Sequence, residues 1–222
     1  MTDKRITLFS GHYGSGKTNV AVNLAYLLKN RGDDVAIYDL DIVNPYFRTV
    51  DAEKELKKRD IKLVVSPYAE TNVDIPAMNS ESYRMVEDKT KKAVVDLGGD
   101  DRGALALGRF AERIKEENDY DFLLVFNCFR PETKDTEGVR EIIREIESVA
   151  KLCFTGMVNN CNLGADTDEE TFFKGLKIAK EVSKELSLPI IFSAAEKSLC
   201  EKVKDKVDTP VLSMELIKYG EW

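Results

Sequence analysis

The chain alternates short apolar runs with segments of helical periodicity, and this alternation limits the folds that it can adopt. The apolar runs are rich in Val, Ile and Phe and do not alternate with polar residues, which is typical of strands buried on both faces of a parallel sheet. They span residues 6–9, 35–38, 61–65, 93–95, 122–126, 152–158 and 189–192. Apolar residues recur at helical spacing in segments 20–28, 139–149 and 171–186. We therefore predict an α/β fold with a doubly wound, mostly parallel sheet.

The chain has 222 residues and shows no internal repeat or long linker, so we expect one domain spanning residues 1–222. Acidic residues outnumber basic ones, 40 to 33, and the net charge is −7. An acidic surface without a long basic run does not attract a phosphate backbone, and we expect no nucleic acid partner. No apolar stretch approaches the roughly 18 residues of a membrane-spanning helix, so we expect no membrane partner.

Four cysteines, Cys128, Cys153, Cys161 and Cys200, are widely spaced and form no CxxC pair. This spacing argues against a zinc or iron–sulfur site and against a disulfide framework. Buried, reduced thiols suit the cytoplasm, where we expect the protein to function.

The first predicted strand runs directly into a glycine-rich loop, which a helix follows. The loop reads Gly11, His12, Tyr13, Gly14, Ser15, Gly16, Lys17 and Thr18. This is the pattern G-x-x-x-x-G-K-[ST] in the strand–loop–helix context of a phosphate-binding loop. Its backbone N–H groups and the helix N-terminus would hold phosphates, Lys17 would reach the β- and γ-phosphates, and the Thr18 hydroxyl would bind Mg²⁺. The sequence therefore predicts a P-loop NTPase fold.

Acidic residues follow two other predicted strands. Asp39 and Asp41 follow the second run, and Asp96 opens a D-x-x-G segment that ends at Gly99. Carboxylates at these strand ends would hold Mg²⁺ beside the phosphates, and Gly99 would form part of a switch that senses the γ-phosphate. We predict Thr18, Asp39, Asp41 and Asp96 as the metal site.

These motifs resemble those of the CobQ/CobB/MinD/ParA superfamily of P-loop nucleotide-binding proteins. The resemblance implies that Asp41 positions or activates the attacking water and that Asn160, at the end of Gly156-Met157-Val158-Asn159-Asn160, bonds the adenine. It further implies that Ser193 and Ala194 line the base pocket.

The choice between adenine and guanine depends on residues 159–162, Asn-Asn-Cys-Asn. GTPases read guanine with N-K-x-D, whose Asp accepts two hydrogen bonds, and Asn162 stands in that position here. An amide matches two donors less well than a carboxylate. Ser193-Ala194, however, resembles the last GTPase motif. We favour ATP, with Mg²⁺, as the cofactor.

One position departs from the MinD/ParA pattern. His12, the single histidine, stands where that family usually has a second lysine that reaches a partner chain's phosphates. A homodimer is possible, but any ATP-dependent dimer should be weaker than in relatives with that lysine. Arg48, Arg102 and Arg130 are candidates to replace the lysine, and Arg102 ranks first because it follows Asp96 closely.

These features predict an Mg²⁺-dependent ATP-binding protein and slow ATPase, acting as a nucleotide switch or accessory factor for an unknown client. One alternative is an ATP-dependent small-molecule ligase or kinase of the CobB or dethiobiotin-synthetase type. The other is a GTPase metallochaperone, against which the lack of a Cys/His cluster counts.

Overall fold

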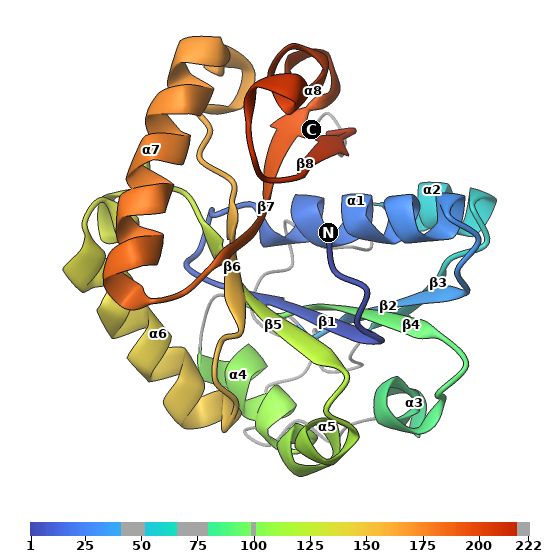
Figure 1. Ribbon diagram of the computed structural model, residues 1–222. Helices are drawn as coiled ribbons and strands as arrows, with labels where there is room; N and C mark the ends of the chain where they lie inside the picture. The colour runs from blue at the N-terminus through green and yellow to red at the C-terminus, as the bar shows by residue number, and fades with distance from the viewer. Residues whose placement is uncertain (41–51, 66–79, 99–100, 217–222) are drawn as a thin grey trace, which may run out of the picture.

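The computed structural model describes residues 1–40, 52–65, 80–98 and 101–216. In this part of the chain, eight strands form one parallel sheet with the order β3-β2-β4-β1-β5-β6-β7-β8 (Figure 1). The strands are β1 (Ile6–Ser10), β2 (Val35–Asp39), β3 (Lys62–Val65), β4 (Lys92–Asp96), β5 (Tyr120–Phe126), β6 (Gly156–Asn159), β7 (Ile190–Glu196) and β8 (Val211–Met214). The predicted α/β class and parallel sheet are confirmed. Because the strands are parallel, their carboxyl ends meet at one edge of the sheet.

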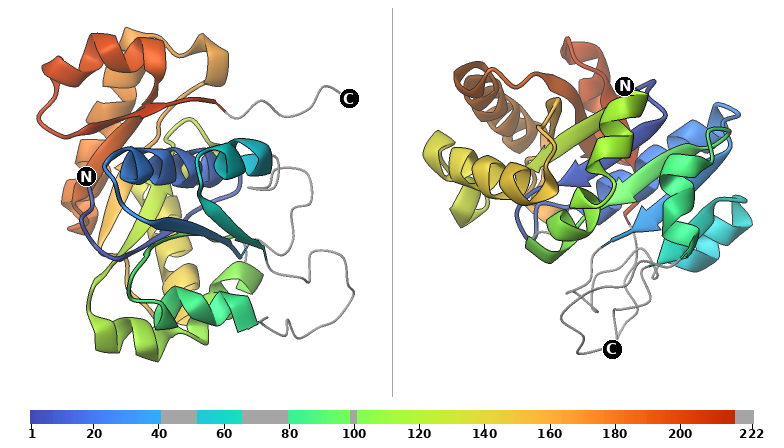
Figure 2. Two further views of the ribbon diagram at one scale, coloured as in Figure 1. Left: turned by 90° about the vertical axis from the view of Figure 1, so that its right-hand side faces the viewer. Right: turned by 90° about the horizontal axis from the view of Figure 1, so that it is seen from below.

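Helices cover both faces of this sheet (Figures 1 and 2). The helices are α1 (Lys17–Asn30), α2 (Glu53–Lys58), α3 (Ser80–Glu87), α4 (Asp101–Gly108), α5 (Ala111–Glu117), α6 (Thr136–Ala150), α7 (Glu169–Leu186) and α8 (Lys197–Val203). Short 3₁₀ turns lie at η3 (Pro131–Thr133), η4 (Gly164–Asp166) and η5 (Lys204–Lys206). The first predicted helix ends just before Gly32, as expected. Among the described helices, none has both the length and the apolar composition needed to cross a bilayer.

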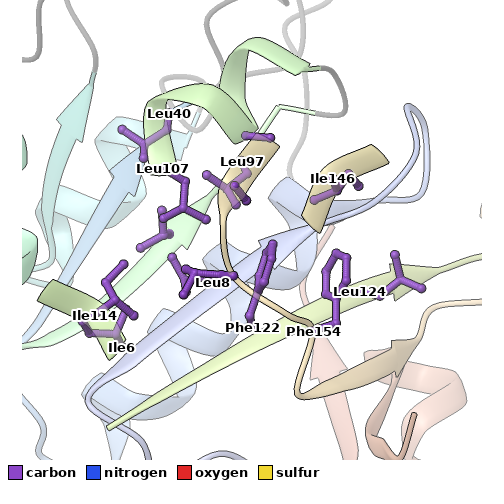
Figure 3. Close-up of a cluster of buried hydrophobic side chains, with 14 of the residues drawn as sticks. Ile6, Leu8, Leu40, Leu97, Leu107, Ile114, Phe122, Leu124, Ile146 and Phe154 are labelled. Carbon is purple, nitrogen blue, oxygen red and sulfur yellow. The ribbon is translucent and has the colours of Figure 1, made fainter. Parts of the chain in front are cut away.

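The core lies in two layers, one on each side of the sheet, because successive strand residues point to opposite faces. On one side, Ile6 and Leu8 of β1 pack with residues of α3 to α7, including Leu107 and Ile146 (Figure 3). On the other side, Phe9 packs with the apolar face of α1, with α2 and with β8. The two layers explain why the strand sequences are apolar at consecutive positions.

One predicted boundary is wrong. The apolar run 152–158 contains a strand only from Gly156, because Leu152 and Phe154 before it are buried by packing and not by strand pairing. Phe154 there stacks on Phe122, with ring centroids 4.1 Å apart. The apolar runs do not predict β8, which pairs with β7 from Ser193↔Val211 to Glu196↔Met214.

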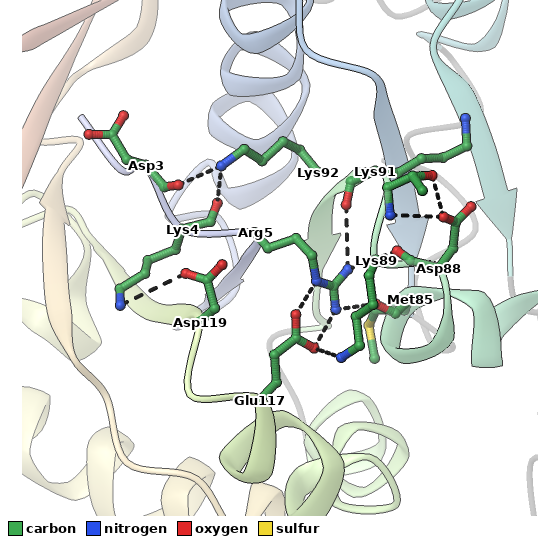
Figure 4. Close-up of polar contacts among 11 residues, drawn as sticks. Asp3, Lys4, Arg5, Met85, Asp88, Lys89, Lys91, Lys92, Glu117 and Asp119 are labelled. Atoms are coloured by element: carbon green, nitrogen blue, oxygen red, sulfur yellow. Dashed lines mark hydrogen bonds and ion pairs between the residues drawn. The ribbon is translucent and has the colours of Figure 1, made fainter.

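A buried ion pair ties the amino end of the sheet together (Figure 4). Arg5 and Glu117 have side chains only 8% and 10% exposed, and Nη2 of Arg5 lies 2.6 Å from Oε2 of Glu117. The same guanidinium donates to the carbonyl oxygens of Met85 (3.0 Å) and Asp88 (3.2 Å), and Lys89 also bonds Glu117. Burial would raise the pKa of Glu117, but hydrogen bonds from Arg5 and Lys89 hold it below its usual value.

Candidate nucleotide-binding site

The loop between β1 and α1 curls tightly enough to form a cradle. Gly11 adopts a φ of +143°, and a Cβ there would lie 2.7 Å from the Val125 carbonyl oxygen of β5. Only glycine fits this position without moving the neighbouring strand. Lys17 is 7% exposed, and its Nζ donates to the carbonyl oxygens of Gly11 and His12, both at 3.1 Å. The loop thus holds one positive charge in a fixed place.

A cavity of about 800 Å³ opens beside this loop. Most of its walls come from the loop with the first residues of α1, the segment after β6, and the segment from the end of β7 into α8, and Arg130 after β5 adds to them. Its polar and small lining residues include Tyr13, Gly14, Gly16, Lys17, Thr18, Arg130, Asn160, Cys161, Ala194 and Glu196. Apolar groups of Phe172, Leu199 and Met214 complete it. The volume lies in the range of small-molecule and cofactor sites.

Asn160, which directly follows β6, connects that segment to the glycine-rich loop. Its Nδ2 donates to the Ser15 carbonyl oxygen at 2.7 Å, and both residues are almost fully buried. Its Oδ1 has no hydrogen-bond partner among the described residues. Asn160 lines the cavity, and its buried Oδ1 is an acceptor whose hydrogen-bonding capacity the described residues leave unused.

Ser193 and Ala194, expected in a loop after residue 192, lie within β7, and their surroundings differ. Ala194 lines the cavity, whereas the Ser193 hydroxyl is fully buried and accepts a hydrogen bond from Asn159 Nδ2 at 3.1 Å. The Asn159 Oδ1 in turn accepts from the backbone N–H of Cys161 at 3.3 Å. Ser193 therefore supports the segment after β6 through Asn159 and does not itself line the cavity.

The structure brings two of the predicted metal ligands together. Asp39 ends β2 and Asp96 ends β4, and the two are register partners on adjacent strands, 1% and 2% exposed. Neither lines the cavity, while Thr18 at the start of α1 does. Carboxylates and a threonine hydroxyl are the kinds of oxygen donor that suit Mg²⁺, so the residue types fit the expected ion. Asp41 and Gly99 lie outside the described residues, as does the Arg102 side chain.

His12 is not among the residues that line the cavity. Its Nδ1 lies 3.0 Å from the Tyr13 carbonyl oxygen and 3.6 Å from Oε2 of Glu132 in η3. Arg130, one of the three arginines weighed as a replacement for the absent lysine, lies at the cavity beside Gly14.

Sequence reasoning missed several lining residues. Gly164 and Thr167 after β6, Glu196 at the end of β7 and Leu199 in α8 carry no motif. Their position directly after strand ends was the one available signal.

Two of the four cysteines meet at this site. The backbone N–H of Cys128, after β5, lies 3.2 Å from Cys161 Sγ, after β6. Burial raises the pKa of the Cys161 thiol. Cys128, Cys161 and Cys200 are buried free thiols, and Cys153 is exposed.

The parallel sheet, the glycine-rich loop and the cavity together define a P-loop nucleotide-binding protein. The chain belongs to the CobQ/CobB/MinD/ParA nucleotide-binding domain family, whose model matches residues 6–163. A comparison with curated proteins finds no match.

Solved structures of P-loop proteins share the fold. The cell division protein FtsY of Thermotoga maritima has a TM-score of 0.58 at 17% identity, covering 87% of this chain and 62% of FtsY. FtsY of Mycoplasma mycoides has a TM-score of 0.53 at 18% identity, covering 86% of this chain and 60% of that one. The signal recognition particle 54 kDa protein of Aeropyrum pernix, in complex with GDP, has a TM-score of 0.55 at 18% identity, covering 85% and 40%. The chain thus spans about three fifths of the FtsY chains and two fifths of the 54 kDa protein.

Proposed function

We propose that the chain binds ATP with Mg²⁺, hydrolyses it slowly, and works as a nucleotide-dependent switch or accessory factor for a client. The observation that carries this proposal is the single cavity that joins the phosphate loop, with Lys17 and Thr18, to Asn160 at the end of β6. A nucleotide has the same two ends, a phosphate chain and a base. Family membership establishes nucleotide binding.

The choice of ATP rests on the side-chain amide of Asn160, which lines the cavity. Its second Nδ2 hydrogen matches the acceptor N7 of a purine, and Oδ1 matches the exocyclic amine of adenine. Guanine carries an oxygen in place of that amine, so Oδ1 would face a second acceptor. The side chain thus favours adenine.

In this account Mg²⁺ neutralises charge on the terminal phosphates when it is bound. Thr18, Asp39, Asp41 and Asp96 would hold it. Lys17 contacts the phosphates, and Asp41 orients the attacking water.

Phosphate release and calorimetry on the same variants test this assignment. Asp41→Asn should retain ATP affinity and lose most hydrolysis, since orienting water is a transition-state role. Asp96→Asn should raise the Mg²⁺ concentration needed for tight binding. If Asp41→Asn turns over like the unsubstituted chain, the water-orienting role is wrong. If hydrolysis appears only with a third small molecule, the ligase or kinase alternative replaces the switch.

A further inference from the structure

Arg130 stands on a rigid turn directly after β5. The buried Asn127 holds this turn: its carbonyl oxygen accepts from the Arg130 backbone N–H at 3.2 Å and from the Thr133 hydroxyl at 2.6 Å. The Asn127 Oδ1 accepts from the Phe129 N–H at 3.1 Å. The position from which the Arg130 side chain extends is therefore fixed by buried hydrogen bonds.

The side chain lies against the phosphate loop. A Cβ on Gly14 would lie 3.6 Å from Arg130 Nε and 3.7 Å from its Cζ, which is ordinary contact distance. The guanidinium lines the same cavity as Lys17 and Thr18. Among the described residues no carboxylate pairs with it, so its donors are available to a ligand.

We propose that the Arg130 guanidinium contacts the terminal phosphates of the bound nucleotide and supplies, from the same chain, the second positive charge beside Lys17. This inference rests on the proposed function, because it assigns a residue to the phosphate end of that site. A guanidinium presents a planar fork of donors that matches two phosphate oxygens, and its charge does not depend on pH in the physiological range.

The surroundings of His12 argue for the arginine over the histidine. His12 faces the Glu132 carboxylate and the Tyr13 carbonyl oxygen, so any charge on its ring is offset locally. Arg130 and Glu132 stand on the same turn, but only the arginine reaches the cavity. If Arg130 of the same chain supplies this charge, ATP hydrolysis does not need a second copy of the chain.

Affinities for ATP, ADP and AMP distinguish this role from others. Arg130→Gln removes the charge, Arg130→Lys keeps it without the fork, and Arg144→Gln removes an exposed arginine on α6 as the matched control. Loss of one charge-assisted contact should weaken ATP binding by roughly tenfold. AMP should bind unchanged, Arg130→Lys should recover part of the ATP affinity, and Arg144→Gln should behave like the unsubstituted chain. Hydrolysis per chain should not depend on protein concentration.

Three results would overturn the proposal. Equal losses for ATP and AMP would mean that Arg130 supports the base or the loop shape. Unchanged ATP affinity in Arg130→Gln would remove the contact altogether. Hydrolysis that rises with protein concentration would place the activating charge on a second chain. Absence of nucleotide binding by the unsubstituted chain is a separate failure, because it refutes the proposed function and this inference with it.

Discussion

Asn160→Ala should weaken both the phosphate loop and the discrimination between bases. The substitution removes a 2.7 Å hydrogen bond between Nδ2 and the Ser15 carbonyl oxygen, in a place where both residues are at most 2% exposed. A buried hydrogen bond of this kind contributes about 1–3 kcal/mol when one partner is removed. For a chain of this length each kcal/mol lowers the unfolding midpoint by about 2–4 °C.

The second expected effect of Asn160→Ala concerns binding of the base. Without the Asn160 amide, the affinity for ATP should fall by roughly tenfold or more, and most of the preference for ATP over GTP should disappear. Asn160→Asp keeps the shape but turns an acceptor toward the Ser15 carbonyl oxygen, so it should destabilise the chain at least as much.

Thermal unfolding and competition between ATP and GTP give the two readouts. Asn30→Ala, at the exposed end of α1, is the matched control and should change neither. The reasoning would be refuted if Asn160→Ala had the same unfolding midpoint as the unsubstituted chain and kept its preference for ATP.

Two further predictions concern the framework and the thiols. Glu117→Gln leaves the buried Arg5 without its carboxylate and should cost about 3 kcal/mol in chemical unfolding, with ATP affinity unchanged because the pair lies at the opposite end of the sheet. Because folding lowers the pKa of Glu117, its contribution to stability is present above the ordinary carboxyl pKa near 4.3 and is lost as the pH falls through the folded value. The difference in unfolding free energy between the unsubstituted chain and Glu117→Gln should therefore narrow below about pH 4. A difference that widens there would contradict the assignment. In native labelling with a maleimide, mass spectrometry should find Cys153 modified first and Cys161 last; early modification of Cys161 would mean that its wall of the cavity opens.

The phosphate loop and most strands could be predicted because their signals are local. The motif from Gly11 to Thr18 fixes residue types at set spacings, and burial on both faces makes β1 and β5 mostly apolar. The start of β6 could not be predicted, since Leu152 and Phe154 are apolar for packing and not for strand pairing. Four residues with alternating exposure make β8 too short for its pattern to indicate a strand.

The walls of the site were harder to predict than its phosphate end. Asn160 was expected to bond the base, but its bond to Ser15 depends on how β6 lies beside the loop, which no spacing encodes. Arg130 ranked below Arg102 because closeness along the chain was the only guide. The parallel sheet brings the end of β5 next to the end of β1, and this neighbourhood places Arg130 at Gly14.

Calorimetry of Mg²⁺-ATP binding to the unsubstituted chain and to Lys17→Ala tests the central claim most directly. Lys54→Ala, an exposed lysine on α2, is the matched control. The account predicts saturable binding that is stronger for ATP than for GTP, an affinity about ten- to a hundredfold lower in Lys17→Ala, and no change in Lys54→Ala. Equal ATP affinity in the unsubstituted chain and in Lys17→Ala would contradict it.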